Sequence, residues 1–196
     1  MEVIWAALIG AGATVAATIM SFYYKNKNEC LHKSELLKNH VDQNANVYAL
    51  LDHTMEKIGC DRVHVFEFHN GDTYYSGSSQ QKFSSTYEVV QNGVSSEAMN
   101  LQNLRISTFN TLIKDVIKNE CFLCESIESV SSQTERAHLQ RQGVKSVYSF
   151  SITTLTGKII GIFSIDFVQS QRSLTEGDKS FLLNQALILS GYLCED

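Results

Sequence analysis

The feature that most constrains this chain is its uncharged N-terminal segment. Residues 3–24, VIWAALIGAGATVAATIMSFYY, contain no charged side chain. A helix of about 20 apolar residues spans the hydrocarbon core of a bilayer. Residues 1–24 therefore predict a transmembrane anchor. Lys25 and Lys27 follow it directly, and basic residues favour the cytoplasmic side, so we expect a single-pass membrane protein with its N-terminus outside and its bulk in the cytoplasm.

Residues 25–58 predict a helical connector with a seam. Apolar residues alternate there at spacings of three and four, which is typical of a coiled coil and predicts a homodimer. The seam residues that we expect to pair between chains are Leu37, Val41, Asn44, Tyr48, Leu51 and Met55. An amphipathic helix lying on its own domain gives nearly the same spacing. Both can hold if the first half pairs and the second half covers a sheet, with Gly59 ending the helix.

Composition narrows the partners and the compartment. The net charge is −5, so the chain lacks the basic footprint of proteins that bind the phosphate backbone, and no nucleic-acid partner is expected. Its five cysteines are an odd number without the dense spacing of a disulfide-stapled scaffold. A reducing compartment therefore fits better than an oxidising one.

Residues 59–196 predict one α+β domain. The expected strands are 62–69, 83–90, 121–127, 144–153 and 157–168, and the expected helices are 108–119, 134–142 and about 174–194. Thr175 and Asp178 have the spacing of a capping box at the start of the last helix. The order of elements predicts a mostly antiparallel sheet with helices on both faces.

The C-terminal part of the domain carries a recurring pattern of glycines and a helix start. The residues that match are Gly143, Ser146, Gly157, Gly161, Leu174, Thr175 and Asp178. This pattern resembles that of GAF domains, and the resemblance extends back to about residue 34. It implies a GAF-like fold with a sensory or binding role. The bilin-attachment cysteine of phytochromes and the N-K-F-D-E signature of phosphodiesterase GAF domains are not evident, so neither ligand is carried over. The E-F-H-N-G string behind an anchor also resembles small anchored GAF-like proteins encoded by bacteriophages.

Alternation along three expected strands separates an apolar face from a face with small polar and charged groups. GAF-like sheets bury one face under the terminal helices and enclose ligands on the other, so we assign the apolar face to the helices. The polar face then carries Glu67, His69, Ser149, Ser151, Ser164 and Asp166 as candidate ligand-binding residues. Buried carboxylates need partners. Arg105 is a further candidate contact, and the alternative is that Arg105, Arg136, Arg141 or Lys158 pairs with the carboxylates or that these face solvent.

The stretch 66–79, FEFHNGDTYYSGSS, combines titratable and aromatic groups. Asn70-Gly71-Asp72 predicts the turn that ends the strand, because Asn-Gly and Gly-Asp pairs accept positive φ. His69 remains a candidate ligand contact. Tyr74 and Tyr75 are expected at the mouth of a pocket, where they would supply stacking surfaces.

Cys121 and Cys124 invite a zinc or redox interpretation. A structural zinc site needs four ligands, and no second Cys-x-x-Cys or close histidine pair is present. A strand would place the two sulfurs on opposite faces, without the helix N-terminus that stabilises a thiolate. We therefore predict no catalytic residue, no metal and no cofactor, with cysteine redox chemistry left open.

Three functional hypotheses follow. The first is a membrane-tethered, non-catalytic GAF-like sensor that binds a small polar molecule or a protein. The second is a phage-type membrane interaction or lysis-associated factor without a ligand. The third is a cysteine-dependent redox enzyme.

Overall fold

The computed structural model describes residues 2–194, and the side chains of residues 1–17, 19, 30–32 and 34 lie outside that description. The chain divides into two compact units, residues 1–44 and 45–196. Helix α1 (Glu2–Ile58) runs through both units without a break, including the predicted boundary after residue 24. Gly59 ends it, as the sequence predicted, with φ 68° and an N–H bond to the carbonyl of Met55.

The predicted membrane anchor is corrected by the helix content of the structure. Among the described residues, none of the helices combines the length and the apolar character needed to cross a bilayer. The uncharged segment 3–24 is instead the first part of α1, which continues into a charged stretch. The prediction of a single-pass membrane protein with its N-terminus outside is therefore wrong. Most side chains of that segment lie outside the described residues.

An antiparallel sheet forms the centre of the unit 45–196. Its strands are β1 (Arg62–Thr73), β2 (Ser79–Val90), β3 (Leu104–Arg105), β4 (Cys121–Cys124), β5 (Ser146–Thr153) and β6 (Ile159–Phe167). Within the described chain they lie in the order β3-β2-β1-β6-β5-β4, and every neighbouring pair is antiparallel. This confirms the predicted α+β class with an antiparallel sheet.

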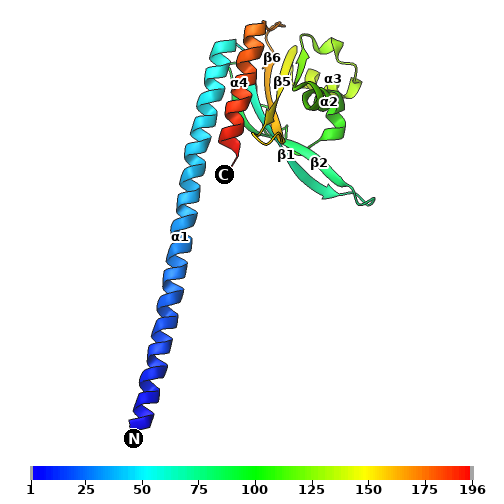
Figure 1. Ribbon diagram of the computed structural model, residues 1–196. Coiled ribbons are helices and arrows are strands. Elements are labelled where there is room, and N and C mark those ends of the chain that lie inside the picture. The colour runs from blue at the N-terminus through cyan, green and yellow to red at the C-terminus, as the bar shows by residue number, and fades with distance from the viewer. Residues whose placement is uncertain (1, 195–196) are drawn as a thin grey trace. The chain divides into compact units, whose positions relative to one another are not determined.

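Two apolar cores cover the two faces of the sheet. The residues 45–58 of α1 and the helix α4 (Glu176–Leu193) bury one face with Leu51, Phe163 and Leu189. The other face lies under α2 (Asn110–Asn119) and α3 (Gln133–Arg141), with the short 3₁₀ helices η1 (Ile106–Phe109) and η2 (Ile127–Ser129) beside them. Figure 1 shows α4 on one side of the sheet and α2 with α3 on the other. The prediction of helices on both faces is confirmed.

Of two short motifs that predicted where an element starts or ends, one is confirmed and the other is wrong. Thr175 and Asp178 form the predicted capping box, each side chain accepting the other residue's backbone N–H. Asn70-Gly71-Asp72 does not end the first strand, because β1 continues to Thr73 and the turn lies at residues 74–78. Gly71 instead allows a close approach, since a Cβ there would lie 2.7 Å from the carbonyl oxygen of Gln80.

Gly161 marks the tightest contact in the centre of the sheet. It pairs with Glu67 of β1 and with Ile152 of β5. A Cβ on Gly161 would lie 2.2 Å from the carbonyl oxygen of Phe66, a backbone atom that cannot rotate away. A side chain at this position therefore forces neighbouring strands apart.

Replacing this glycine tests that packing constraint. We expect Gly161→Ala to lower the free energy of unfolding by about 3 kcal/mol, because the strands must shift to accept the methyl group. Gly191→Ala is the matched control, since Gly191 lies in α4 with no atom near its Cβ position. That variant should gain roughly 0.5–1 kcal/mol from helix propensity. Urea denaturation followed by circular dichroism measures both, and equal stabilities would contradict the prediction.

Candidate functional site

A polar row crosses the sheet on the face covered by α2 and α3. Strand register places Glu88 of β2 beside His64 of β1, His64 beside Ser164 of β6, and Ser164 beside Ser149 of β5. Side chains at paired positions lie on the same face of a sheet. The hydroxyls of Ser149 and Ser164 are 2.9 Å apart and share a hydrogen bond. The next row on the same face places Arg62 of β1 beside Asp166 of β6, so polar and charged groups continue across two rows of the sheet.

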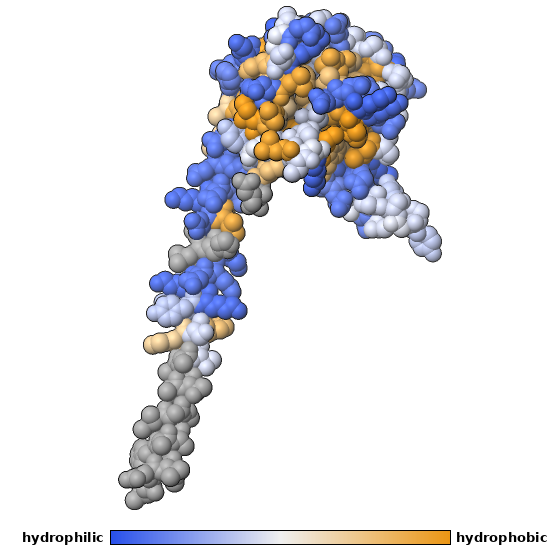
Figure 2. Space-filling model, in the orientation of Figure 1, coloured by the Kyte–Doolittle hydropathy of each residue, from blue (hydrophilic) through white to orange (hydrophobic). Residues whose placement is uncertain are grey.

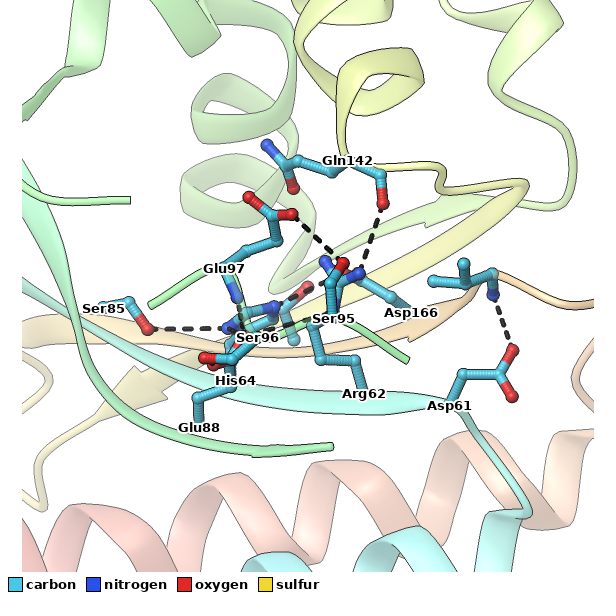
Figure 3. Close-up of polar contacts among 12 residues, drawn as sticks. Asp61, Arg62, His64, Ser85, Glu88, Ser95, Ser96, Glu97, Gln142 and Asp166 are labelled. Carbon is cyan, nitrogen blue, oxygen red and sulfur yellow. Dashed lines mark hydrogen bonds and ion pairs between the residues drawn. The ribbon is translucent and has the colours of Figure 1, made fainter. Parts of the chain in front are cut away.

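A buried charged cluster lies at one end of this row. Nη1 of Arg62 is 3.5 Å from Oδ2 of Asp166, and its Nε is 4.0 Å from Oε1 of Glu88. The His64 ring lies between the same carboxylates, with Nε2 3.4 Å from Asp166 and Nδ1 3.7 Å from Glu88. The four side chains are between 0 and 5% exposed. Figure 3 shows them converging beneath Gln142 and Glu97.

Three buried nitrogens of the cluster lack a hydrogen-bond partner. Nε and Nη1 of Arg62 and Nε2 of His64 have no such partner among the described residues, although carboxylate oxygens lie within 4.0 Å. A buried donor without an acceptor costs about 1–3 kcal/mol. The ion pairs reduce that cost without removing the need for an acceptor. A hydroxyl group supplied by water or by a ligand would satisfy His64 Nε2 in either tautomer, because it can both donate and accept.

Glu88 also holds the segment that covers this face. We call residues 91–103, between β2 and β3, the cover loop. The carboxylate of Glu88 accepts the hydroxyl of Ser96, the N–H of Glu97 at 2.8 Å and the N–H of Ala98 at 3.2 Å. The loop is also joined to β2 by Ser85, whose N–H donates to the carbonyl of Leu101. The charged cluster and the cover loop therefore form one connected network.

The cover elements and the sheet leave a cavity of about 40 Å³. His64, Asp166, Ser149, Ser164 and Gln142 supply its polar lining, and apolar side chains supply the rest: Phe66, Phe83, Leu101, Leu104, Phe109, Leu112, Leu139, Val147 and Ile162. A buried water needs roughly 10–15 Å³ on this scale, so about three waters would fill the space. An engineered cavity of about 150 Å³ is known to hold benzene. The cavity as it stands takes water or only the end of a larger molecule.

The structure brings together some of the residues that the sequence singled out. Ser149, Ser164 and Asp166 line the cavity, on the face that we assigned to them. Ser151 shares their side of β5 but does not line the cavity, and it accepts a hydrogen bond from Thr153. Whether these residues bind a ligand remains a prediction.

Other candidates lie away from the cavity. Glu67 pairs with Gly161, on the α1 and α4 face, and His69 shares that parity and bonds to the hydroxyl of Ser84 at 2.9 Å. The expectation that they face the pocket is therefore wrong. Tyr74 and Tyr75 lie exposed at the β1–β2 turn, and Arg105 is exposed in β3 beside Lys82. None of these five lines the cavity.

Sequence reasoning missed the central groups of the site. Arg62 and His64 were placed in a strand but not on the polar face, and Glu88 was not singled out. The signal that could have found them is the alternation of Arg62, His64 and Phe66, which puts a guanidinium and an imidazole on one face of a central strand. Such side chains are buried only with partners, so acidic partners on β2 and β6 were to be expected.

The cysteine pair has the geometry that the sequence predicted. Cys121 and Cys124 lie in β4, with Cys121 packed against the α1 and α4 core and Cys124 buried in the other core. Burial raises the pKa of both thiols. A raised pKa disfavours the thiolate that redox chemistry requires, so the structure gives no support to the redox hypothesis.

Glu135 connects the two helices that cover the cavity. Ser132 caps α3 and accepts the N–H of Glu135, which is 2% exposed. Oε1 of Glu135 accepts the N–H of Thr111 at 2.6 Å, at the start of α2, while Oε2 has no hydrogen-bond partner among the described residues. Burial raises the pKa of this carboxyl, and the bonds from Thr111 oppose the shift. The helix contact thus contains a carboxyl whose charged form is disfavoured by burial.

No family model and no curated protein matches the sequence, whereas solved structures match the fold. The PixJ GAF domain of Thermosynechococcus elongatus aligns with a TM-score of 0.61 and 16% identity, over 78% of this chain and 88% of its own. The GAF domain region of a putative membrane protein from Geobacter sulfurreducens aligns with 0.59 and 14%, over 81% and 97%. A far-red absorbing protein with bound biliverdin aligns with 0.55 and 13%, over 73% and 84%. The predicted GAF-like fold is confirmed, and the phage resemblance finds no support in these comparisons.

Titrating Glu135 tests its place between the cover helices. Because its pKa is higher in the folded chain, the folded state binds the proton more tightly, so stability is greatest below the ordinary glutamate pKa and falls as pH rises through the raised one. Glu135→Gln keeps an acceptor for Thr111 and removes the buried charge, so it should be more stable than wild type near neutral pH by up to about 1 kcal/mol. This advantage should vanish in acid.

Glu135→Ala is the companion variant. It removes the acceptor of Thr111 and should cost about 1–2 kcal/mol. Chemical denaturation from about pH 3.5, below the ordinary glutamate pKa, to about pH 8 measures all three proteins. A Glu135→Gln variant that is less stable than wild type at every pH would contradict the assignment of a raised pKa.

Proposed function

We propose that residues 45–196 form a GAF-like sensory module that binds a small molecule, without catalysing a reaction, with one end of that molecule in the cavity between the sheet and the cover elements. The observation that carries this proposal is the polar end of a mostly apolar cavity: His64, Asp166, Ser149 and Ser164 line it, and Nε2 of His64, which is 1% exposed, has no hydrogen-bond partner among the described residues. Enclosed apolar sites with a few fixed polar groups are typical of small-molecule binding. The likeness in fold to the light-absorbing GAF domain of PixJ and to a protein with bound biliverdin supports the same role.

The charges of the cluster favour a particular kind of contact at this end. Two carboxylates surround one guanidinium, so the cluster carries an excess negative charge when His64 is neutral. An anionic group placed on His64 would meet Asp166 and Glu88 at close range. An uncharged group, apolar or with one acceptor oxygen, fits this end of the cavity better.

Ligand-dependent stability tests the proposal. A compound that binds only the folded chain adds about 2.7 kcal/mol at one hundred times its dissociation constant, which raises the melting temperature by several degrees. We expect at least one compound of a panel of small amides, alcohols, amino acids and nucleosides to do so with the full-length protein. The measurement is differential scanning fluorimetry, confirmed by calorimetry.

The matched variants are Ser149→Val and Ser151→Val. Both lie on β5 with the same parity, but only Ser149 lines the cavity. Ser149→Val adds volume at the polar end, so it should weaken binding by about tenfold or more, an effect of about 1.4 kcal/mol. Ser151→Val should leave it unchanged. The proposal fails if the whole panel leaves wild type unshifted, or if Ser149→Val binds as well as wild type.

We also propose that α1 pairs two copies of the chain. Leu37 and Val41 in the unit 1–44 are 66% and 57% exposed. Figure 2 shows apolar groups here within an otherwise hydrophilic stretch of α1. Leu51 is instead fully buried in the core of the unit 45–196, and Met55 packs against this core. The part of the seam that a second chain can reach therefore lies before Leu51. This supports a helix whose first half pairs with a second chain and whose second half covers the sheet.

Charged substitutions on the seam test this pairing. Leu37→Glu with Val41→Glu should convert a dimer to a monomer, because like charges would face each other across the seam. Asn39→Glu with Asn46→Glu adds the same charges on the opposite side of the helix and should leave the dimer intact. Light scattering coupled to size exclusion gives the molar mass. A monomeric wild type would refute the proposal.

A further inference from the structure

A second hollow lies directly outside the cavity, between the cover loop and α3. It measures about 370 Å³ and is lined by Glu97, Asn100, Leu101, His138, Arg141 and Gln142. Its lining is mostly polar, whereas that of the cavity is mostly apolar. We call it the cleft. The cover loop and α3, which form it, also contribute to the lining of the cavity.

The cavity and the cleft share a wall. Leu101 and Gln142 line both of them. The ring of His138, in the cleft, lies 5.2 Å from the ring of Phe109, in the cavity. The two spaces are therefore neighbours, with Leu101 and Gln142 between them. Small-molecule sites usually measure roughly 300–1,000 Å³. The cavity alone is far below this range, and the cleft joined to it falls within it.

The cleft presents one charge of each sign. Glu97 is bonded to Ser95 and Asn100 but forms no ion pair with the cations among the described residues. Arg141 donates to the carbonyl of Ala137 and to Nδ1 of His138, and no carboxylate of the described residues pairs with it. Partial burial and the neighbouring Arg141 lower the pKa of His138, which keeps that ring neutral and able to accept. An unpaired carboxylate and an unpaired guanidinium thus line the same hollow.

We propose that the cavity and the cleft form one binding site for an α-amino acid with a small aliphatic side chain. Its carboxylate pairs with Arg141 and its ammonium with Glu97. Its side chain passes between Leu101 and Gln142 into the apolar cavity. This inference rests on the proposed function and names the ligand class of the same site. The two opposite charges of the head group match those of the cleft, and the short uncharged tail matches a cavity of about 40 Å³ whose polar end disfavours anions.

The probes are L-valine and three compounds that each lack one feature. Isovalerate lacks the ammonium, isobutylamine lacks the carboxylate, and glycine lacks the aliphatic side chain. We expect L-valine to raise the melting temperature of the full-length protein and to give a saturable heat signal in calorimetry. Each of the three analogues should bind about tenfold more weakly or worse, because one charge-assisted bond or the apolar contact is lost.

Variants of the cleft test the assigned partners. Arg141→Gln and Glu97→Gln should each weaken binding of L-valine by about tenfold or more. Lys118→Gln is the matched control, since Lys118 is an exposed basic residue of α2 that does not line the cleft. It should bind as wild type does. All of these substitutions are at exposed or partly exposed positions, so unfolding does not explain a loss.

The outcomes separate this inference from the proposed function. If a neutral compound binds in a manner that Ser149→Val weakens, while L-valine does not bind, the amino-acid inference fails and the proposed function stands. The inference also fails if L-valine binds but Arg141→Gln and Glu97→Gln bind it as well as wild type does. If no compound of either set shifts the protein, both fail.

Discussion

The buried cluster of Arg62, His64, Glu88 and Asp166 is the constraint on which the site depends. Taking an ion out of water costs several kcal/mol, so each buried charge must be surrounded by compensating groups. Here the compensation reaches beyond the sheet. Glu88 is satisfied by the backbone of the cover loop, and Nη2 of Arg62 donates to the carbonyl of Gln142 at the end of α3. Both elements that close the cavity are therefore held in place by the same charges.

This arrangement explains why the polar end of the cavity is not filled by the protein itself. The carboxylates of the cluster are fixed by the cover loop on one side and by the strand register on the other. Their distances of 3.4 to 4.0 Å to the donors are set by that framework rather than by the best hydrogen-bond geometry. A buried nitrogen that this framework leaves without a hydrogen-bond partner is free to bond to a water molecule or a ligand. One such nitrogen is Nε2 of His64, which lies 3.4 Å from Oδ2 of Asp166, and His64 lines the cavity.

The sequence predicted the architecture better than the site. Along β5 and β6 the apolar and polar parities are clearly different, and Ser149, Ser164 and Asp166 were assigned to the correct face. Along β1 both parities contain aromatic or titratable groups, so alternation alone could not choose between His64 and Glu67. Register decided it, because Glu67 lies opposite Gly161 and His64 opposite Ser164. Register depends on contacts between distant segments, which a single sequence does not reveal.

The fold fixes where a ligand can lie, and the side chains fix which ligand fits. The aligned structures share the sheet and its covering helices with this chain at 13 to 16% identity, and one of them holds biliverdin. In this chain the cavity is much smaller than a bilin, because Phe66, Phe83 and Phe109 fill much of the space beside the sheet and leave about 40 Å³. A shared fold therefore does not carry over a large chromophore. The chemistry of the cluster and the cleft, rather than the likeness in fold, is what limits the choice of ligand.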